Sequence, residues 1–343
     1  MFFWMPDSPT EAKFLSDDDK VIAIERLRNN HMGVMSREWR SSHVWETLLD
    51  LKTWFWVSMI FCISVPSNGI STFGPLIIQS FVSDPFQTML FNVPIGFSHI
   101  IAVAGSAYLS MRWKLKGPVI ALLCIPPIVG CSILLYFTHE TENKAVLLAG
   151  YFCLSTYTGI SKYTPCSSCA FHPNRIVAAP LIYSWSAQNT AGDTKRKSTS
   201  ALVFIGASAG NIVGPLLYSP EDAPGYSSGL RVNLGLYVMV MCLVVGASLH
   251  IKRLNLQHGR RRVALGKSAV VVDMSLETAE EVERMEVMEN SQHQGSARGI
   301  ADNEADNPSR GDALEEDGHG TQQGDKAFGD VTDLENEDFL FVF

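Results

Sequence analysis

Six apolar stretches follow one another through the middle of the chain, each about as long as a lipid bilayer is thick. We place them at Thr53 to Phe81, Thr88 to Ser110, Lys116 to Phe137, Ala145 to Ala187 with an interruption, Thr199 to Tyr218, and Leu230 to Ile251. A helix of about 20 apolar residues is long enough to cross the hydrocarbon core of a membrane. The pattern therefore predicts an all-α integral membrane protein with six transmembrane helices in residues 53–251.

The short loops between these stretches alternate between basic and acidic. The basic loops hold Arg112, Lys114, Lys195, Arg196, Lys197 and residues 252–262, and the opposite loops hold Asp84, Glu140, Glu142, Glu221 and Asp222. Short loops rich in Lys and Arg stay on the cytoplasmic side of a membrane. Both termini are therefore expected in the cytoplasm. A soluble bundle of six buried helices would not require this alternation.

Charge is also divided between the two ends of the chain. From Ser268 onward there are 20 Asp or Glu against 4 Lys or Arg, which leaves 15 acidic and 23 basic residues before it. The basic part suits anionic membrane lipid as a partner and not nucleic acid. The acidic part has few large apolar groups, so we expect residues 252–343 to form a disordered cytoplasmic tail. Residues 1–52 are expected to be a cytoplasmic segment.

Signals for metal binding or catalysis are weak. Cys166 and Cys169, with His172 nearby, have the spacing of half a zinc site, but no second Cys or His pair accompanies them. The sequence contains none of the usual nucleophile, metalloprotease or phosphate-binding motifs. We therefore expect no metal site, no cofactor and no enzyme activity.

Residues 162–179 interrupt the fourth apolar stretch with polar and charged residues that would be costly in lipid. One interpretation is a retained intron, because codons for Ser161 to Tyr163 and for Pro173 and Asn174 can spell splice-donor-like and branch-point-like sequences. The alternative is a genuine re-entrant or loop insertion. Sequencing of the transcript distinguishes the two.

Several short stretches occur in an order that identifies a family resemblance. They are Met5–Pro9, Ala12–Leu15, Glu25–Arg28, Asp50–Trp54, Tyr183–Trp185, Asn189–Gly192, Thr194–Arg196, Phe204–Gly206, Gly210–Pro215 and Asp222–Tyr226. In this order and spacing they resemble the second half of a major facilitator superfamily transporter, specifically the fungal allantoate permease family of anion:cation symporters. The resemblance covers about residues 2–252.

This resemblance implies a six-helix half of a major facilitator superfamily bundle in the plasma membrane. It also implies proton-coupled uptake of a small organic anion, such as allantoate, ureidosuccinate or a carboxylate vitamin, by alternating access between two halves. The first six helices of the family are absent, so we interpret the chain as truncated, with a separate N-terminal six-helix half as a further partner. The alternative is a half-length, non-transporting membrane interaction or regulatory protein.

Polar residues inside the apolar stretches are the candidates for a substrate path. Asn68 lies in a run with Pro66 and Gly69 that can break helical hydrogen bonding, and Asn92 precedes another proline. His99 is the candidate for proton coupling, because an imidazole titrates near neutral pH. The alternative for each is a structural hydrogen bond, from Asn68 to another helix and from His99 to a neighbour, and for His99 this is the more common role.

Three further residues complete the set of substrate-binding candidates. Tyr183 and Trp185 can cradle a planar ligand or anchor the helix at the membrane surface. Asn211 stands in a surface of small residues from Gly206 to Gly214, which predicts a close helix–helix seam. Mid-span acidic or basic residues are lacking, so the charge that pairs with an anion is expected in the missing half.

Overall fold

The computed structural model describes residue 16 and residues 39–81, 90, 92–113, 115–137, 144–158, 179–223, 225–265, 331–336 and 339–342. The chain divides into two units, and nearly all described residues belong to the one formed by Arg37–Lys267 and Thr332–Phe343. That unit is a helical bundle. The zinc-like pair at Cys166 and Cys169, and all of the 162–179 segment before Ala179, lie outside the described residues.

The described part of the chain contains helices and no strands, which confirms the expected all-α class. The helices are α2 (Ser41–Leu49), α3 (Leu51–Phe81), α5 (Asn92–Trp113), α6 (Gly117–Leu123), α7 (Ile125–Phe137), α8 (Lys144–Thr158), α9 (Ala179–Gln188), α10 (Asp193–Leu216), the short 3₁₀ helix η2 (Pro220–Asp222) and α11 (Ser227–Ala264).

Four stretches within the described residues are long and apolar enough to cross a membrane: Leu51–Gln79, Gly117–Phe137, Asp193–Leu216 and Ser227–Ala264. They correspond to the first, third, fifth and sixth expected spans. α5 occupies the second expected span. The fourth appears as two shorter helices, α8 and α9, on either side of the interruption, with a short apolar part at Ala145–Ser155.

Two helices differ from the sequence-based expectation in ways that bear on the site. α3 remains helical through Pro66 and Pro75, although the run around Asn68 is one that can break helical hydrogen bonding. A proline costs one backbone hydrogen bond but is tolerated in a membrane helix when neighbouring helices pack against it. α11 continues to Ala264, past the expected end of the span at Ile251, so the residues directly after Ile251 are helical.

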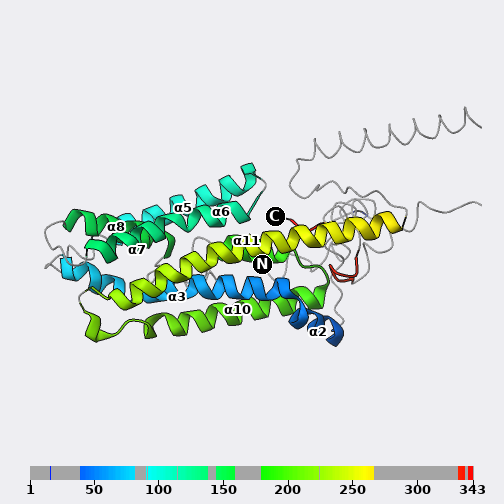
Figure 1. The fold of residues 1–343 in the computed structure, drawn as a ribbon, viewed down its shortest axis with the longest axis horizontal. Coiled ribbons are helices and arrows are strands. Elements are labelled where there is room, and N and C mark those ends of the chain that lie inside the picture. Colours follow the sequence, from blue (N-terminus) through cyan, green and yellow to red (C-terminus); the bar gives the residue numbers. More distant parts are fainter. Residues whose placement is uncertain are drawn as a thin grey trace, which may run out of the picture. The chain divides into compact units, whose positions relative to one another are not determined.

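α3 lies at the centre of the bundle and packs against α10 on one side and α11 on the other (Figure 1). α7 packs against α8, and α11 contacts both α6 and α7. The outer face of α10 exposes large apolar side chains, including Ile205, Ile212 and Leu216. Such a face is unfavourable in water and suits lipid or a partner helix.

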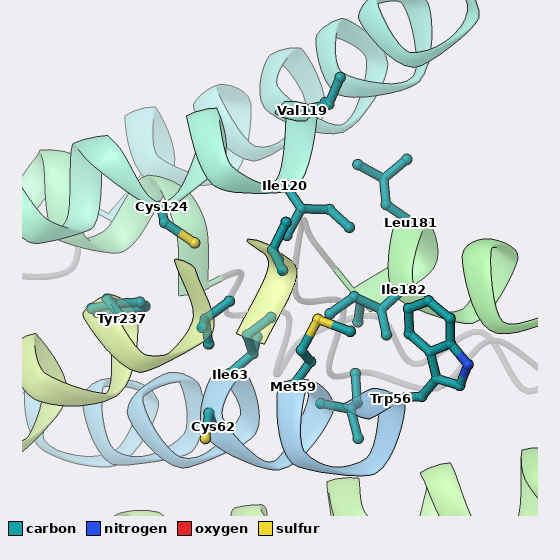
Figure 2. Packing of buried hydrophobic residues seen from close by; sticks show 14 of the residues in the cluster. Trp56, Met59, Cys62, Ile63, Val119, Ile120, Cys124, Leu181, Ile182 and Tyr237 are labelled. Atoms are coloured by element: carbon teal, nitrogen blue, oxygen red, sulfur yellow. The ribbon is translucent and has the colours of Figure 1, made fainter. Parts of the chain in front are cut away.

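The buried core of the bundle is built where α3, α6, α9 and α11 meet. Figure 2 shows Trp56 and Met59 of α3 beside Ile182 of α9, with Ile120 of α6 nearby. All four side chains are fully buried. The ring of Trp56 also meets the ring of Trp185 edge to face, with centroids 4.7 Å apart. Burial of this kind fixes where the ends of α3 and α9 lie.

A short segment from the far end of the chain packs against the same bundle. We call it the tail segment and define it as residues 332–336 and 339–342 (red in Figure 1). It includes the buried residues Asp333, Phe339 and Phe341. The sequence led us to expect disorder throughout residues 252–343, so these residues and the end of α11 differ from that expectation.

Candidate functional site

A close seam between α3 and α10 carries two of the six candidate residues. A Cβ atom added at Gly214 would lie 2.4 Å from the carbonyl oxygen of Val65, and one added at Gly210 would lie 2.8 Å from that of Phe61. At Gly206 the corresponding contact, with the Val57 side chain, would be 3.0 Å. The three glycines therefore let the backbones of the two helices approach, which confirms the seam predicted from the small residues of α10.

Asn68 and Asn211 meet across this seam. The side-chain amide of Asn68 donates a hydrogen bond to the backbone carbonyl of Asn211, and both residues are half-buried. Among the described residues the side-chain oxygen of Asn211 is buried and accepts no hydrogen bond. The arrangement fits the helix–helix hydrogen bond that we set beside the substrate role for Asn68, and it leaves one polar atom that can accept from a ligand or water.

The other intramembrane candidates lie on α5, away from this seam. The Nε2 atom of His99 forms a hydrogen bond with the backbone carbonyl of Ser155 on α8, so His99 is held by a neighbouring helix. Asn92 is the first residue of α5, and its side chain lies outside what the structure describes. The structure therefore does not bring His99 together with Asn68 and Asn211.

Tyr183 and Trp185 both lie on α9 but have different surroundings. Tyr183 is half-buried and its ring stacks on Phe204 of α10, with centroids 5.2 Å apart. Trp185 is fully buried, and its indole N–H donates to the carbonyl oxygen of Val342 in the tail segment at 2.8 Å. Trp185 thus contacts a part of the chain that sequence reasoning did not place near it.

Sequence reasoning missed a buried group of charges where α2 meets α3 and where α10 begins. We call it the charge cluster; its members are Glu46, Asp50, Lys52, Lys195 and Asp333. The ammonium of Lys195 lies 2.8 Å from Glu46, 3.1 Å from Asp50 and 3.0 Å from Asp333. Lys52 forms an ion pair with Asp333 and lies 3.6 Å from Asp50.

Asp333 is the member of the charge cluster that the tail segment contributes. Its side chain and that of Lys195 are 0 % exposed, and that of Lys52 is 2 % exposed. Burial alone would raise the pKa of the Asp333 carboxyl, but the ammonium groups of Lys52 and Lys195 lower that pKa by more, so the carboxyl stays ionised. The removal of one partner from a buried ion pair typically destabilises a protein by about 3–5 kcal/mol.

A turn at Gly192 brings the start of α10 into place. Gly192 has a φ of 87°, a left-handed conformation that a residue without a Cβ adopts at little cost, and it makes the turn between α9 and α10. This turn places Lys195 beside Asp50 and lets the backbone N–H of Ala191 donate to Asp333 at 3.3 Å. The Asn189–Gly192 stretch, which carried part of the family resemblance, thus shapes the charge cluster.

The chain is similar to several curated fungal transporters. The chain is 30% identical over 243 residues to an MFS-type transporter of Penicillium expansum, covering 70% of this chain and 46% of the relative. It is 27% identical over 253 residues to a thiamine pathway transporter of Saccharomyces cerevisiae, covering 73% of this chain and 43% of the relative. It is 24% identical over 273 residues to the allantoate permease of the same yeast, covering 76% of this chain and 45% of the relative.

The chain spans a little less than half the length of these curated relatives. No protein-family model matches it, and no solved structure matches it. The relatives are transporters and permeases and not enzymes. Together with the membrane-length helices, they identify the chain as an integral membrane protein with an all-α fold that is similar to part of fungal MFS-type transporters.

Proposed function

We propose that the chain forms one half of a transporter for a small organic anion, of the allantoate, ureidosuccinate or carboxylate-vitamin type, in the plasma membrane. The observations that carry this proposal are the similarity to an MFS-type transporter over 243 residues and the presence of membrane-length helices in the chain. Transporters of this architecture bind substrate near the bilayer midplane, between two six-helix halves, and rock one half against the other. An anion coupled to proton entry can be concentrated in the cell against its gradient.

The α3–α10 seam supports a substrate contact on this half. Asn68 and Asn211 are the polar pair within the seam, and the side-chain oxygen of Asn211 has free hydrogen-bonding capacity among the described residues. The glycines bring the backbones of the two helices together beside this pair. We assign substrate contact to Asn68 and Asn211, with Asn92, Tyr183 and Trp185 as further candidates.

His99 is the proposed proton-coupling residue. Its hydrogen bond to the Ser155 carbonyl fixes the orientation of the ring between α5 and α8. A histidine in a membrane bundle can take up and release a proton in the physiological range. The charges in the basic loops support an orientation with both termini in the cytoplasm.

Reconstitution into liposomes tests the proposal. The chain is incorporated alone, and together with the part of the Penicillium expansum relative that it does not cover, with an acidic medium outside. Uptake of radiolabelled allantoate, ureidosuccinate and a carboxylate vitamin is then measured with and without a protonophore. We expect saturable uptake of at least one of these anions only when both parts are present, and its loss when the protonophore is added.

Each other outcome has a defined meaning. Saturable uptake that is unchanged by the protonophore would contradict proton coupling and the role of His99. Co-purification of the two parts without uptake of any anion would contradict the transport proposal and favour the non-transporting membrane interaction or regulatory protein. A chain recovered in the soluble fraction without detergent would contradict the membrane assignment itself.

A further inference from the structure

The tail segment lies at the end of the bundle where α3 and α10 begin. The bundle contacts both its side chains and its backbone. Its partners come from four different helices: Lys52 of α3, Trp185 of α9, Lys195 of α10, and Asn255 and His258 of α11. Asn189, directly after α9, is a further partner. We call these six residues the tail site.

Two asparagines bind the backbone of the tail segment in the same way. The side chain of Asn255 accepts from the N–H of Phe341 at 3.0 Å and donates to its carbonyl at 2.9 Å. The side chain of Asn189 accepts from the N–H of Val342 at 2.8 Å and donates to its carbonyl at 3.0 Å. Each side-chain amide thus satisfies both backbone groups of one residue, as a neighbouring strand would in a sheet.

The side chains of the tail segment are also recognised. Asp333 enters between the two lysines, which no aliphatic or basic residue could replace without leaving buried charge unpaired. The ring of Phe341 lies beneath the ammonium of Lys52, 4.6 Å from its centroid, and meets the His258 ring at 5.2 Å. Phe341 is 1 % exposed, so its apolar surface is removed from water.

The sequence separation shows that this contact does not follow from local folding. Asp333 lies 281 residues beyond Lys52, and residues 266–330 separate the end of the α11 turn from the segment. A long connection gives a bound segment only a modest effective concentration, so an external copy can compete with it. The partners of the segment belong to the helix ends and have polar groups that water can satisfy when the segment leaves.

From these contacts we propose that the tail site is a peptide-binding site that takes an acidic peptide carrying a Phe-Val step. Its occupant is the chain's own tail segment. The bound segment links α3, α9, α10 and α11 at one end of the bundle, so these helix ends cannot separate while it is bound. This inference concerns binding within the chain and is independent of the transport proposal.

Hydrogen exchange on the full chain in lipid nanodiscs tests the intramolecular contact. We expect slow exchange of the amides of Phe341 and Val342, because both donate to asparagine side chains, of which Asn255 is half-buried and Asn189 is buried. Asp333→Asn should speed exchange of these amides at least about 10-fold, which corresponds to about 1.4 kcal/mol. Glu335→Gln is the matched control, because it makes the same charge change two residues away at an exposed position, and it should leave exchange unchanged.

A synthetic peptide tests whether the site accepts a ligand from outside. A fluorescent peptide with the sequence of residues 332–343 should bind to the Asp333→Asn chain, whose own segment has been released, and bind at least about 10-fold more weakly to the unchanged chain. The same peptide carrying Asp333→Asn should not bind. Phe341→Ala is a second releasing variant that leaves every helix residue intact.

The proposal fails under any of four results. Fast exchange at Phe341 and Val342 in the unchanged chain would show that the segment is not bound. Equal exchange in the Asp333→Asn and Glu335→Gln chains would show that the carboxylate is not the anchor. Peptide binding that is the same with and without the Asp333 carboxylate, or no peptide binding to either releasing variant, would exclude a peptide-binding site.

Discussion

The seam between α3 and α10 makes a quantitative prediction at Gly214. In Gly214→Ala the new methyl would lie 2.4 Å from the carbonyl oxygen of Val65 and 2.9 Å from the backbone nitrogen of Gly69. Ordinary contacts of a Cβ are 3.4–4 Å, and both obstructing atoms belong to the backbone, so neither can turn aside. The helices must therefore separate by about 1 Å, enough to forfeit roughly a quarter to a half of the dispersion energy of the affected contacts.

The expected loss of stability follows from two contributions. Overpacking of a well-packed interface costs about 1–3 kcal/mol. Separation of the helices also weakens the hydrogen bond from Asn68 to Asn211, and such bonds average about 0.6 kcal/mol in membrane proteins. The sum is about 1.5–3.5 kcal/mol. At about 2–4 °C per kcal/mol for a domain of this size, the unfolding temperature should fall by roughly 3–14 °C.

Thermal unfolding in detergent, followed by tryptophan fluorescence, measures this effect. Buried Trp56 and Trp185 pack edge to face, so their emission reports on the bundle. Gly235→Ala in α11 is the matched control, because a Cβ there meets nothing within 4 Å. It should be neutral or slightly stabilising, since Ala favours helix over Gly by up to about 1 kcal/mol.

The three seam glycines should also rank by the closeness of the obstructing atoms. The contacts of the new Cβ would be 2.4 Å at Gly214, 2.8 Å at Gly210 and 3.0 Å at Gly206. We therefore expect the loss of stability on substitution by alanine to decrease in that order. A Gly214→Ala chain as stable as Gly235→Ala, or a Gly206→Ala chain less stable than Gly214→Ala, would refute the reasoning.

Three further predictions concern other parts of the chain. Asn68→Leu removes the hydrogen bond to Asn211 and should lower the free energy of unfolding by about 0.6 kcal/mol. Anion uptake should fall by more than this loss of stability explains. A fall in uptake that only matches the loss of stability would contradict substrate contact. His99→Gln should abolish protonophore-sensitive uptake in the reconstituted transporter while anion exchange continues, and unchanged proton-driven uptake would exclude its coupling role. Since Lys52 and Lys195 lower the pKa of Asp333, the stability that this carboxylate contributes within the charge cluster is present above its usual pKa of about 3.9 and is lost as pH falls through the lowered value. Exchange of the Val342 amide, corrected for the intrinsic rate, should therefore stay slow from about pH 7 to about pH 5, and a loss of protection in that range would contradict this assignment.

Sequence reasoning was most successful where the constraint was local. The small residues from Gly206 to Gly214 predicted a close seam, because a helix without bulky side chains on one face permits backbone approach. The partner helix could not be predicted, since any apolar helix satisfies that face equally. The structure supplies it: α3, through Val65 and Gly69.

The surroundings of single polar residues could not be predicted from their own positions. The sequence allowed two interpretations for each of Asn68 and His99. In the structure the side chain of each forms a hydrogen bond with a backbone carbonyl of another helix. Position along a helix determines depth in the membrane, but the neighbour depends on how the helices rotate and pack. Trp185 shows the same limit, because its indole N–H donates to a carbonyl of the tail segment.

The prediction of a disordered tail missed the charge cluster, because it was based on the average composition of the tail. The 20 acidic residues from Ser268 onward look alike in composition, so composition alone does not distinguish Asp333 from the others. The signal that distinguishes Asp333 is the nearby apolar run Phe339–Phe343, which is unusual in a polar tail. When this run packs against the bundle, the Asp333 carboxylate can be buried with it. Desolvation of Lys52 and Lys195 at the helix ends then requires a counter-charge, and Asp333 provides it where Phe341 also covers Lys52. Apolar anchoring and charge pairing therefore act together in the tail segment, and removal of either should release the other.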